Sequence, residues 1–186
     1  MTDPKTDNKP PLTSKELHMK KSLSLVIVLA LCVLCAGSSF AQTTATQTVN
    51  LSVASVQKLV VTGGAITLAV TNGVAGTDAL TSVSDASTSY SITHNSLAAL
   101  KITANLDAAL ASGFSLGITL APSASKGTSL GMVDISASTP ATAVAVVTNI
   151  PKGADAARSI TYTFSANASA GVMSSTAKTV TLTLTN

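Results

Sequence analysis

The sequence predicts an all-β protein, built as a single antiparallel β-sandwich of about eight to ten short strands. Three observations lead to this prediction. Apolar and small polar residues alternate with a period of two along most of the chain after residue 41. Turn-forming clusters such as Asn72-Gly73 and Lys126-Gly127 separate the alternating runs. Extended amphipathic helices and long runs of charge are absent from the sequence.

The predicted strands follow the alternation in order along the chain. Each clean run places its apolar residues on one face and its Thr and Ser residues on the other. These runs are 48–53, 66–71, 89–93, 100–105, 114–120, 133–135, 160–166 and 179–184. Two further apolar runs, 59–61 and 144–147, are also predicted strands. Residues 105–112 have helix-favouring composition, but a loop crossing between strands is the preferred interpretation of this segment.

The predicted core is thin. Ala, Ser and Thr dominate the chain after residue 41, and small side chains let two sheets pack closely. Val, Leu and Ile would fill the space between the sheets. The only aromatic residues after residue 41 are Tyr90, Phe114, Tyr162 and Phe164, which are expected to anchor this core.

The N-terminal region has the pattern of a secretory signal peptide over residues 19–41. Lys20 and Lys21 precede an apolar run at 25–36, and small residues then lead to a cleavage site between Ala41 and Gln42. The run is shorter than the roughly 20 residues that span a bilayer, which disfavours a membrane anchor. Lipidation of Cys35 is disfavoured because bulky Leu34 precedes it.

Residues 1–18 fit no part of a signal peptide and indicate either a start of translation at Met19 or a disordered extension. The predicted mature domain is therefore 42–186, and we expect it to be exported to the cell surface, the extracellular space or the periplasm. Both cysteines, Cys32 and Cys35, would leave with the signal peptide. The mature domain would then have no disulfide and would depend on packing and ladder hydrogen bonds.

Charge and composition exclude several kinds of function. The whole chain has 10% charged residues, and the six basic and five acidic side chains after residue 41 give a net charge of +1. That charge is too small for a nucleic-acid-binding domain, and neither a phosphate-binding glycine loop nor an aromatic platform for bases is present.

Catalytic and metal-binding patterns are also missing. His94 is the only histidine after residue 41; without a nucleophile motif beside it, we expect a hydrogen-bonding residue at a strand end. The five aspartates are dispersed and there is no Trp to stack on a sugar ring. Asp78 and Asp85 lie in a long loop where calcium is one interpretation, but Asx turns explain them without a metal. We therefore predict no enzyme activity and no cofactor, metal or catalytic residue.

A family resemblance rests on three stretches. These are the leader, the segment Gln-Thr-Val-Asn-Leu-Ser-Val at 47–53, and the closing pair at 159–166 and 179–185 with Gly171 between them. They resemble small secreted bacterial β-sandwich proteins and, more loosely, pilin and spore-coat-U-like subunits. The resemblance implies an immunoglobulin-like or pilin-like sandwich with a structural role at the cell surface. The lack of a mature cysteine and the ending Thr185-Asn186 differ from chaperone–usher pilins and argue against that route of assembly.

Two functions remain open. The first is a non-enzymatic structural subunit, fimbrial-like, that associates with itself or with other surface proteins. Its possible strand-exchange segment is Val49, Leu51 and Val53, which would add to a neighbour's sheet edge; the same segment as the first strand of a monomeric sandwich is slightly preferred. The alternative is a monomeric adhesin or glycan-binding module using loops 72–88 and 122–130. An outer-membrane barrel is disfavoured because four aromatic residues cannot form two girdles.

Overall fold

The computed structural model describes residues 44–186. The chain divides into two units, Met1–Leu51 and Ser52–Asn186. In the first unit, residues 44–51 contain neither helix nor strand. The second unit holds the whole fold. The predicted leader, including the cleavage site between Ala41 and Gln42, lies outside the described residues.

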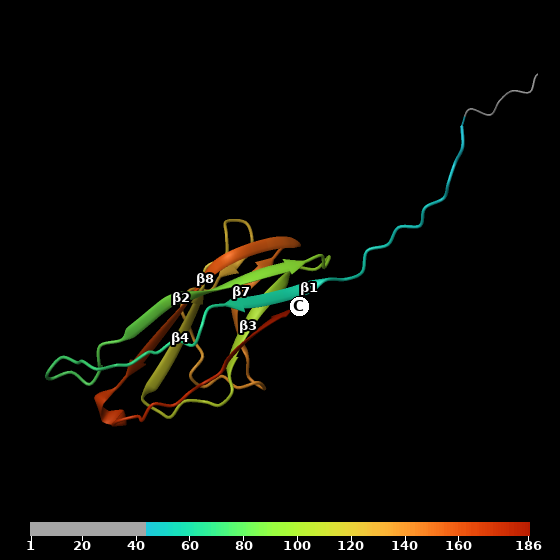
Figure 1. Cartoon of the computed structure of the whole chain (residues 1–186). Helices are drawn as coiled ribbons and strands as arrows, with labels where there is room; N and C mark the ends of the chain where they lie inside the picture. The colour runs from blue at the N-terminus through green and yellow to red at the C-terminus, as the bar shows by residue number, and fades with distance from the viewer. Residues whose placement is uncertain (1–43) are drawn as a thin grey trace, which may run out of the picture. The chain divides into compact units, whose positions relative to one another are not determined.

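The second unit is an all-β sandwich of two antiparallel sheets, as the alternation predicts (Figure 1). The five-stranded sheet has the order β1-β2-β8-β4-β6 and the four-stranded sheet the order β5-β7-β3-β9. In chain order the elements are β1 (Gln57–Thr62), β2 (Val83–His94), β3 (Leu100–Leu106), β4 (Phe114–Leu120), β5 (Thr128–Ser129), β6 (Val133–Asp134), β7 (Val144–Ile150), β8 (Gly153–Ala166), the 3-10 helix η1 (Ala168–Ala170) and β9 (Val180–Thr185).

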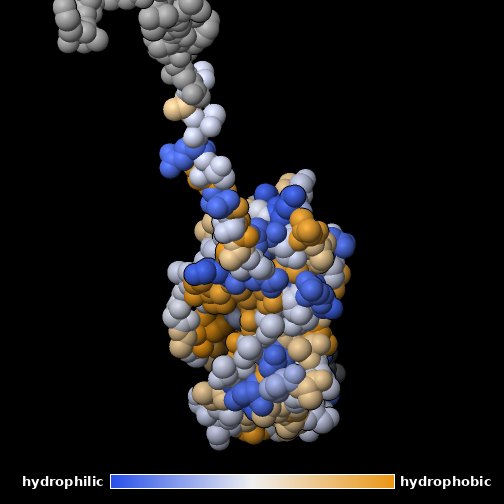
Figure 2. Space-filling view, turned by 90° about the vertical axis from the view of Figure 1, so that its right-hand side faces the viewer, coloured by the Kyte–Doolittle hydropathy of each residue, from blue (hydrophilic) through white to orange (hydrophobic). Residues whose placement is uncertain are grey.

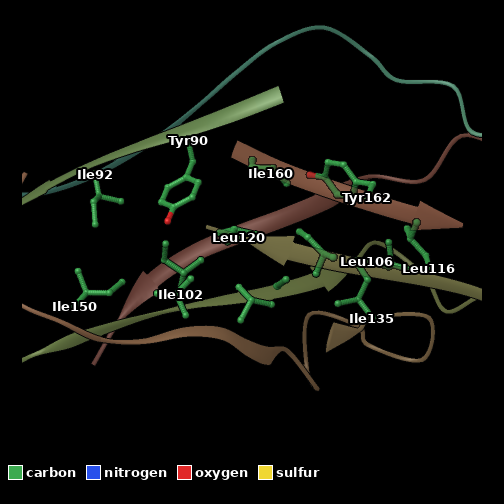
Figure 3. Packing of buried hydrophobic residues seen from close by; sticks show 14 of the residues in the cluster. Tyr90, Ile92, Ile102, Leu106, Leu116, Leu120, Ile135, Ile150, Ile160 and Tyr162 are labelled. Carbon is green, nitrogen blue, oxygen red and sulfur yellow. The ribbon is translucent and has the colours of Figure 1, made fainter. Parts of the chain in front are cut away.

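The core lies between the inner faces of the two sheets (Figure 3). The inward residues of the central strands are fully buried because alternate residues of each strand point to one face. Tyr90 and Tyr162 point from the five-stranded sheet into this layer, which confirms them as core anchors. Phe114 and Phe164 are half-buried and stack on each other with ring centroids 6.4 Å apart.

The two longest strands are longer than the alternation predicts. β2 begins at Val83 and β8 at Gly153, whereas their predicted runs begin at residues 89 and 160. The β2–β8 ladder has register shifts between Asp85 and Thr88 and between Tyr90 and Ile92. Such bulges insert an extra residue and reverse which residues face inward, so the period of two is broken there.

Two predicted strands do not form. Residues 48–53 and 66–71 have no ladder partner. The second of these segments still shows the expected alternation of burial, since Ile66, Leu68 and Val70 are half-buried while their neighbours are exposed. Alternation therefore identified a face that lies on the core, but not a strand. The segment 107–113, by contrast, is a loop with bends and a turn, as predicted.

One side of the sandwich is closed by residues 128–138, which we call the closing segment. It pairs as β5 with β7, crosses to pair as β6 with β4, and then reaches β3, where the Leu106 amide donates to the Ser138 carbonyl at 3.2 Å. Ile135 within it is fully buried. The Ser136 hydroxyl accepts a hydrogen bond of 2.7 Å from the amide of Leu116. The closing segment thus joins both sheets.

Candidate functional site: an open sandwich side and an exposed arm

The opposite side of the sandwich is bounded by two full-length strands, and we call it the open side. β1 pairs only with β2, and β9 pairs only with β3, so within residues 44–186 each has one edge without a ladder partner. Unpaired edges present rows of amide donors and carbonyl acceptors that can bind another strand. The C-terminus, which follows β9, lies beside β1 (Figure 1).

The inward residues of β9 are only partly covered. Val180, Leu182 and Leu184 stand opposite β3 residues that are fully buried, so they face the same layer. The β9 residues are nevertheless only half-buried, because no strand lies beyond them in the four-stranded sheet.

β1, the edge strand of the five-stranded sheet, is also incompletely covered. Val61 is paired with the buried Tyr90 and so faces inward, yet 49% of it remains exposed. Val56 just before β1, and Val60 on its outer face, are also exposed. The face seen in Figure 2 displays hydrophobic surface across its middle, around a hollow. Incompletely covered apolar surface of this kind marks sites of association in soluble proteins.

The second component of the site is the segment Thr48–Val53, which we call the arm. Val49, Leu51 and Val53 are 66%, 88% and 87% exposed. These are the residues predicted to form a strand-exchange segment. The preferred interpretation, that they form the first strand of the domain's own sandwich, is wrong, because the first strand is β1. The arm presents strand-like alternation without a strand partner among residues 44–186.

Between the arm and β1, Asn95 holds residues 54–56. Its side-chain amide donates to the Ala54 carbonyl at 2.8 Å, and its side-chain oxygen accepts from the Val56 amide at 2.7 Å. The backbone amide of Asn95 also donates to the Val56 carbonyl at 3.1 Å. This function of Asn95 was not predictable from the sequence, because a single Asn after a strand is an ordinary turn signal.

A buried polar cluster lies near the ends of β2 and β8. The Asp155 carboxylate, which is buried, accepts from the Ser123 amide at 2.8 Å and from the Ser123 hydroxyl at 2.6 Å. The Arg158 guanidinium donates to the same hydroxyl. Burial, together with the nearby charge of Asp155, raises the pKa of Tyr90 to about 12, against an opposing effect of Arg158. These contacts tie the 122–130 segment to the sheet.

His94 is placed differently from its prediction. It ends β2, as expected, but its side chain is only 3% exposed, and neither ring nitrogen has a hydrogen-bond partner within residues 44–186. Gly153 is its partner across the ladder, and Gln57 stands opposite on β1. The expected hydrogen-bonding function is therefore wrong, and His94 packs as part of the interior.

Asp85 and Asp134 each accept hydrogen bonds from a serine two residues later in the chain. Hydrogen bonds from the hydroxyl and amide of Ser87 lower the pKa of Asp85. At Asp134 partial burial raises the pKa, but hydrogen bonds from Ser136 and Ser115 outweigh that effect and lower it overall. Local hydrogen bonding of this kind is the ordinary use of Asp beside Ser.

The two loops predicted for ligand binding are shorter than expected and are fastened internally. β2 takes up residues 83–88 of the first loop, and β5 takes up residues 128–129 of the second. In the first loop, the Asp78 carboxylate accepts from the amide and hydroxyl of Ser169, both at 2.8 Å. The second is fastened by Ser123 to Asp155. These hydrogen bonds attach both loops to other parts of the fold.

Comparison with known proteins identifies no family for this chain: no protein-family pattern matches it, and no curated protein matches it significantly. Within the part of the chain that the structure describes, no group of three His, Cys, Asp or Glu side chains is arranged to hold a metal ion. In residues 44–186 no helix has the length and apolar character needed to cross a membrane.

Proposed function

We propose that the protein is a non-enzymatic structural subunit that is exported and assembles with copies of itself at the cell surface. The observation that carries the proposal is the pairing of two incomplete features in one chain. The arm exposes three apolar side chains at strand spacing, while the sandwich leaves apolar residues of β1 and β9 partly uncovered. The arm could supply the apolar side chains that would cover these residues.

Burial of apolar side chains would drive the association. Full burial of a Val or Leu side chain contributes about 1.5–3 kcal/mol. This gain works against the ordering of the arm, for which backbone fixation costs about 1–2 kcal/mol per residue, and against the freedom lost when two copies join. Backbone hydrogen bonds along a free edge then fix direction and register.

Two further features support a structural role. Asp78 and Asp155 accept hydrogen bonds that hold loops to the rest of the fold. Export rests on the signal-peptide pattern over residues 19–41, which predicts a cut before Gln42.

The proposal is tested by sizing the exported protein by gel filtration and analytical ultracentrifugation, with negative-stain electron microscopy of the largest species. We expect concentration-dependent oligomers or filaments from the wild-type chain. The triple variant Val49→Ser, Leu51→Ser, Val53→Ser should remain monomeric. Its thermal unfolding midpoint should match that of the dilute wild-type monomer, because the three side chains are 66%, 88% and 87% exposed.

A matched control separates the arm from general surface hydrophobicity. Val74, Leu97 and Val172 are 67%, 96% and 100% exposed and lie outside the open side and the arm. Changing these three to Ser removes a similar exposed apolar area and should leave assembly intact. A wild-type protein that stays monomeric at high concentration, or an arm variant that assembles as well as the control, would contradict the proposal.

A further inference from the structure

The four sheet edges of the sandwich are not equally protected. Natural edges are blunted by short strands, charged residues, prolines or bulges. β5 and β6 are two residues each, and β1 carries Lys58 on its outer face. β9 has the sequence Val-Thr-Leu-Thr-Leu-Thr, and its six residues pair with β3 in one unbroken register. It is the one full-length edge strand within residues 44–186 that has none of these devices.

The arm matches the β9 edge in spacing and polarity. Its apolar residues stand at every second position, as do Val180, Leu182 and Leu184 on the inward face of β9. Paired residues of adjacent strands share a face, so one arm residue would stand beside each β9 residue over the uncovered layer. Asn50 and Ser52 would then lie on the solvent face with Thr181 and Thr183. Neither strand carries a charge, a Pro or a Gly, which suits direct pairing.

The geometry of residues 54–56 indicates which copy supplies the arm. Residues 54–56 lead directly into β1, so a chain that folded back over its own domain would need a turn there. A tight reversal between antiparallel strands needs at least two residues in turn conformation. Ala54 and Val56 are instead held by three hydrogen bonds to Asn95, at 2.7–3.1 Å. An arm supplied by a second copy needs no turn at these residues.

We infer that the free edge of β9 in one copy receives the arm of a second copy, so that Val49, Leu51 and Val53 cover Val180, Leu182 and Leu184. This inference rests on the proposed function and identifies β9 as the strand that receives the arm. The contact is heterologous, since the arm and the edge are different surfaces, and each copy keeps a free arm or a free edge. Such contacts propagate into chains unless the rotation between copies closes a ring.

Disulfide trapping between single-cysteine variants tests the acceptor. All variants are made in the full chain with Cys32 and Cys35 changed to Ser, so that each has a single, engineered thiol. One protein carries Ser52→Cys in the arm. Its partners carry Thr181→Cys or Thr183→Cys on the exposed face of β9, which stand opposite Ser52 in an antiparallel and in a parallel pairing, respectively. A mixture with Val60→Cys on the outer face of β1 is the matched control, because Val60 is also exposed and lies on the other open edge. Mass spectrometry of digested peptides identifies each disulfide.

We expect the disulfide from position 52 to position 181 or to position 183 to form several times more abundantly than the disulfide to position 60. The inference is overturned if position 52 joins position 60 as readily as either β9 position, or if only disulfides between two arms form. Sizing of the same samples without oxidation reports on the proposed function separately. Oligomers that form without a disulfide from the arm to β9 would refute the β9 acceptor alone, whereas their absence would refute self-assembly itself.

Discussion

The two sides of this sandwich differ in how the edges of their two sheets are covered. On one side, the closing segment pairs briefly with β7 and β4, hydrogen-bonds to β3, and buries Ile135 completely. On the other, β1 and β9 run for six residues each with one edge unpaired, and their inward residues remain partly exposed. The difference indicates that a sandwich side is closed by a segment that crosses between sheets, and that without one the outer strands stay available to another chain.

The largest effect expected from this comparison is on packing. Ile135→Ala on the closed side removes a fully buried side chain and should lower the free energy of unfolding by about 2–5 kcal/mol. Leu182→Ala on the open side removes a half-buried one from β9 and should cost about half as much or less, since the remaining cavity opens to solvent. Urea unfolding followed by circular dichroism measures both. Equal losses would show that the open side is as well packed as the closed one.

A smaller effect is expected from two matched polar contacts. The Leu116 amide donates to Ser136 on the closed side, and the Val56 amide donates to Asn95 on the open side, both at 2.7 Å. Ser136→Ala leaves a partly buried amide unpaired and should destabilise the domain by about 1–3 kcal/mol. Asn95→Ala exposes its partners to water and should cost about 1 kcal/mol or less. The same unfolding assay applies, and the reverse order would contradict the comparison.

The smallest expected effect is the loss of stability at alkaline pH that two buried tyrosines cause. Burial raises the pKa of both Tyr90, which stands beside β1, and Tyr162, which stands beside β4. A raised folded-state pKa means that the folded protein holds the phenol proton more tightly. Stability is then complete below the ordinary pKa near 10 and falls as the pH rises toward 12.

Tyr90→Phe should weaken this alkaline loss, leaving the part that belongs to Tyr162. It should also preserve or slightly raise stability at neutral pH, because the Tyr90 hydroxyl has no hydrogen-bond partner within residues 44–186. Urea midpoints measured from pH 8 to 12 for both proteins provide the check. Identical pH profiles would show that the Tyr90 hydroxyl is solvated in the folded state.

The central strands were predictable because their apolar and polar residues alternate in the sequence. β3 and β4 lie in the interior of their sheets, and β4 pairs with β8 over its whole length. The alternation locates β3 even though its ladder with β7 has two register shifts. The early parts of β2 and β8 escaped the prediction for a physical reason. Asp155 and Arg158 are three positions apart and both turn toward the interior, since the bulge between them, where Ala157 has a φ of 52°, shifts the alternation.

The arm was identified from sequence, but its environment was not. Alternation states which residues share a face and leaves open what covers that face, so Val49 and Ile66 have the same pattern and different surroundings. The pattern also cannot show that the β9 edge is free, because that depends on which strands are neighbours. Asn95 and the closing segment gave no distinctive sequence signal, since their function arises from long-range hydrogen bonds.

Amide hydrogen exchange tests the central claim most directly, because it compares the two sides in one experiment. Exchange would be measured by mass spectrometry for the dilute monomer and for the concentrated, assembled protein. The account predicts that peptides covering Thr48–Val53 and Val180–Thr185 become strongly protected on assembly, while the closing segment at 128–138 is unchanged. Assembled protein in which the arm still exchanges as rapidly as in the monomer, or in which protection appears at the closing segment instead, would contradict it.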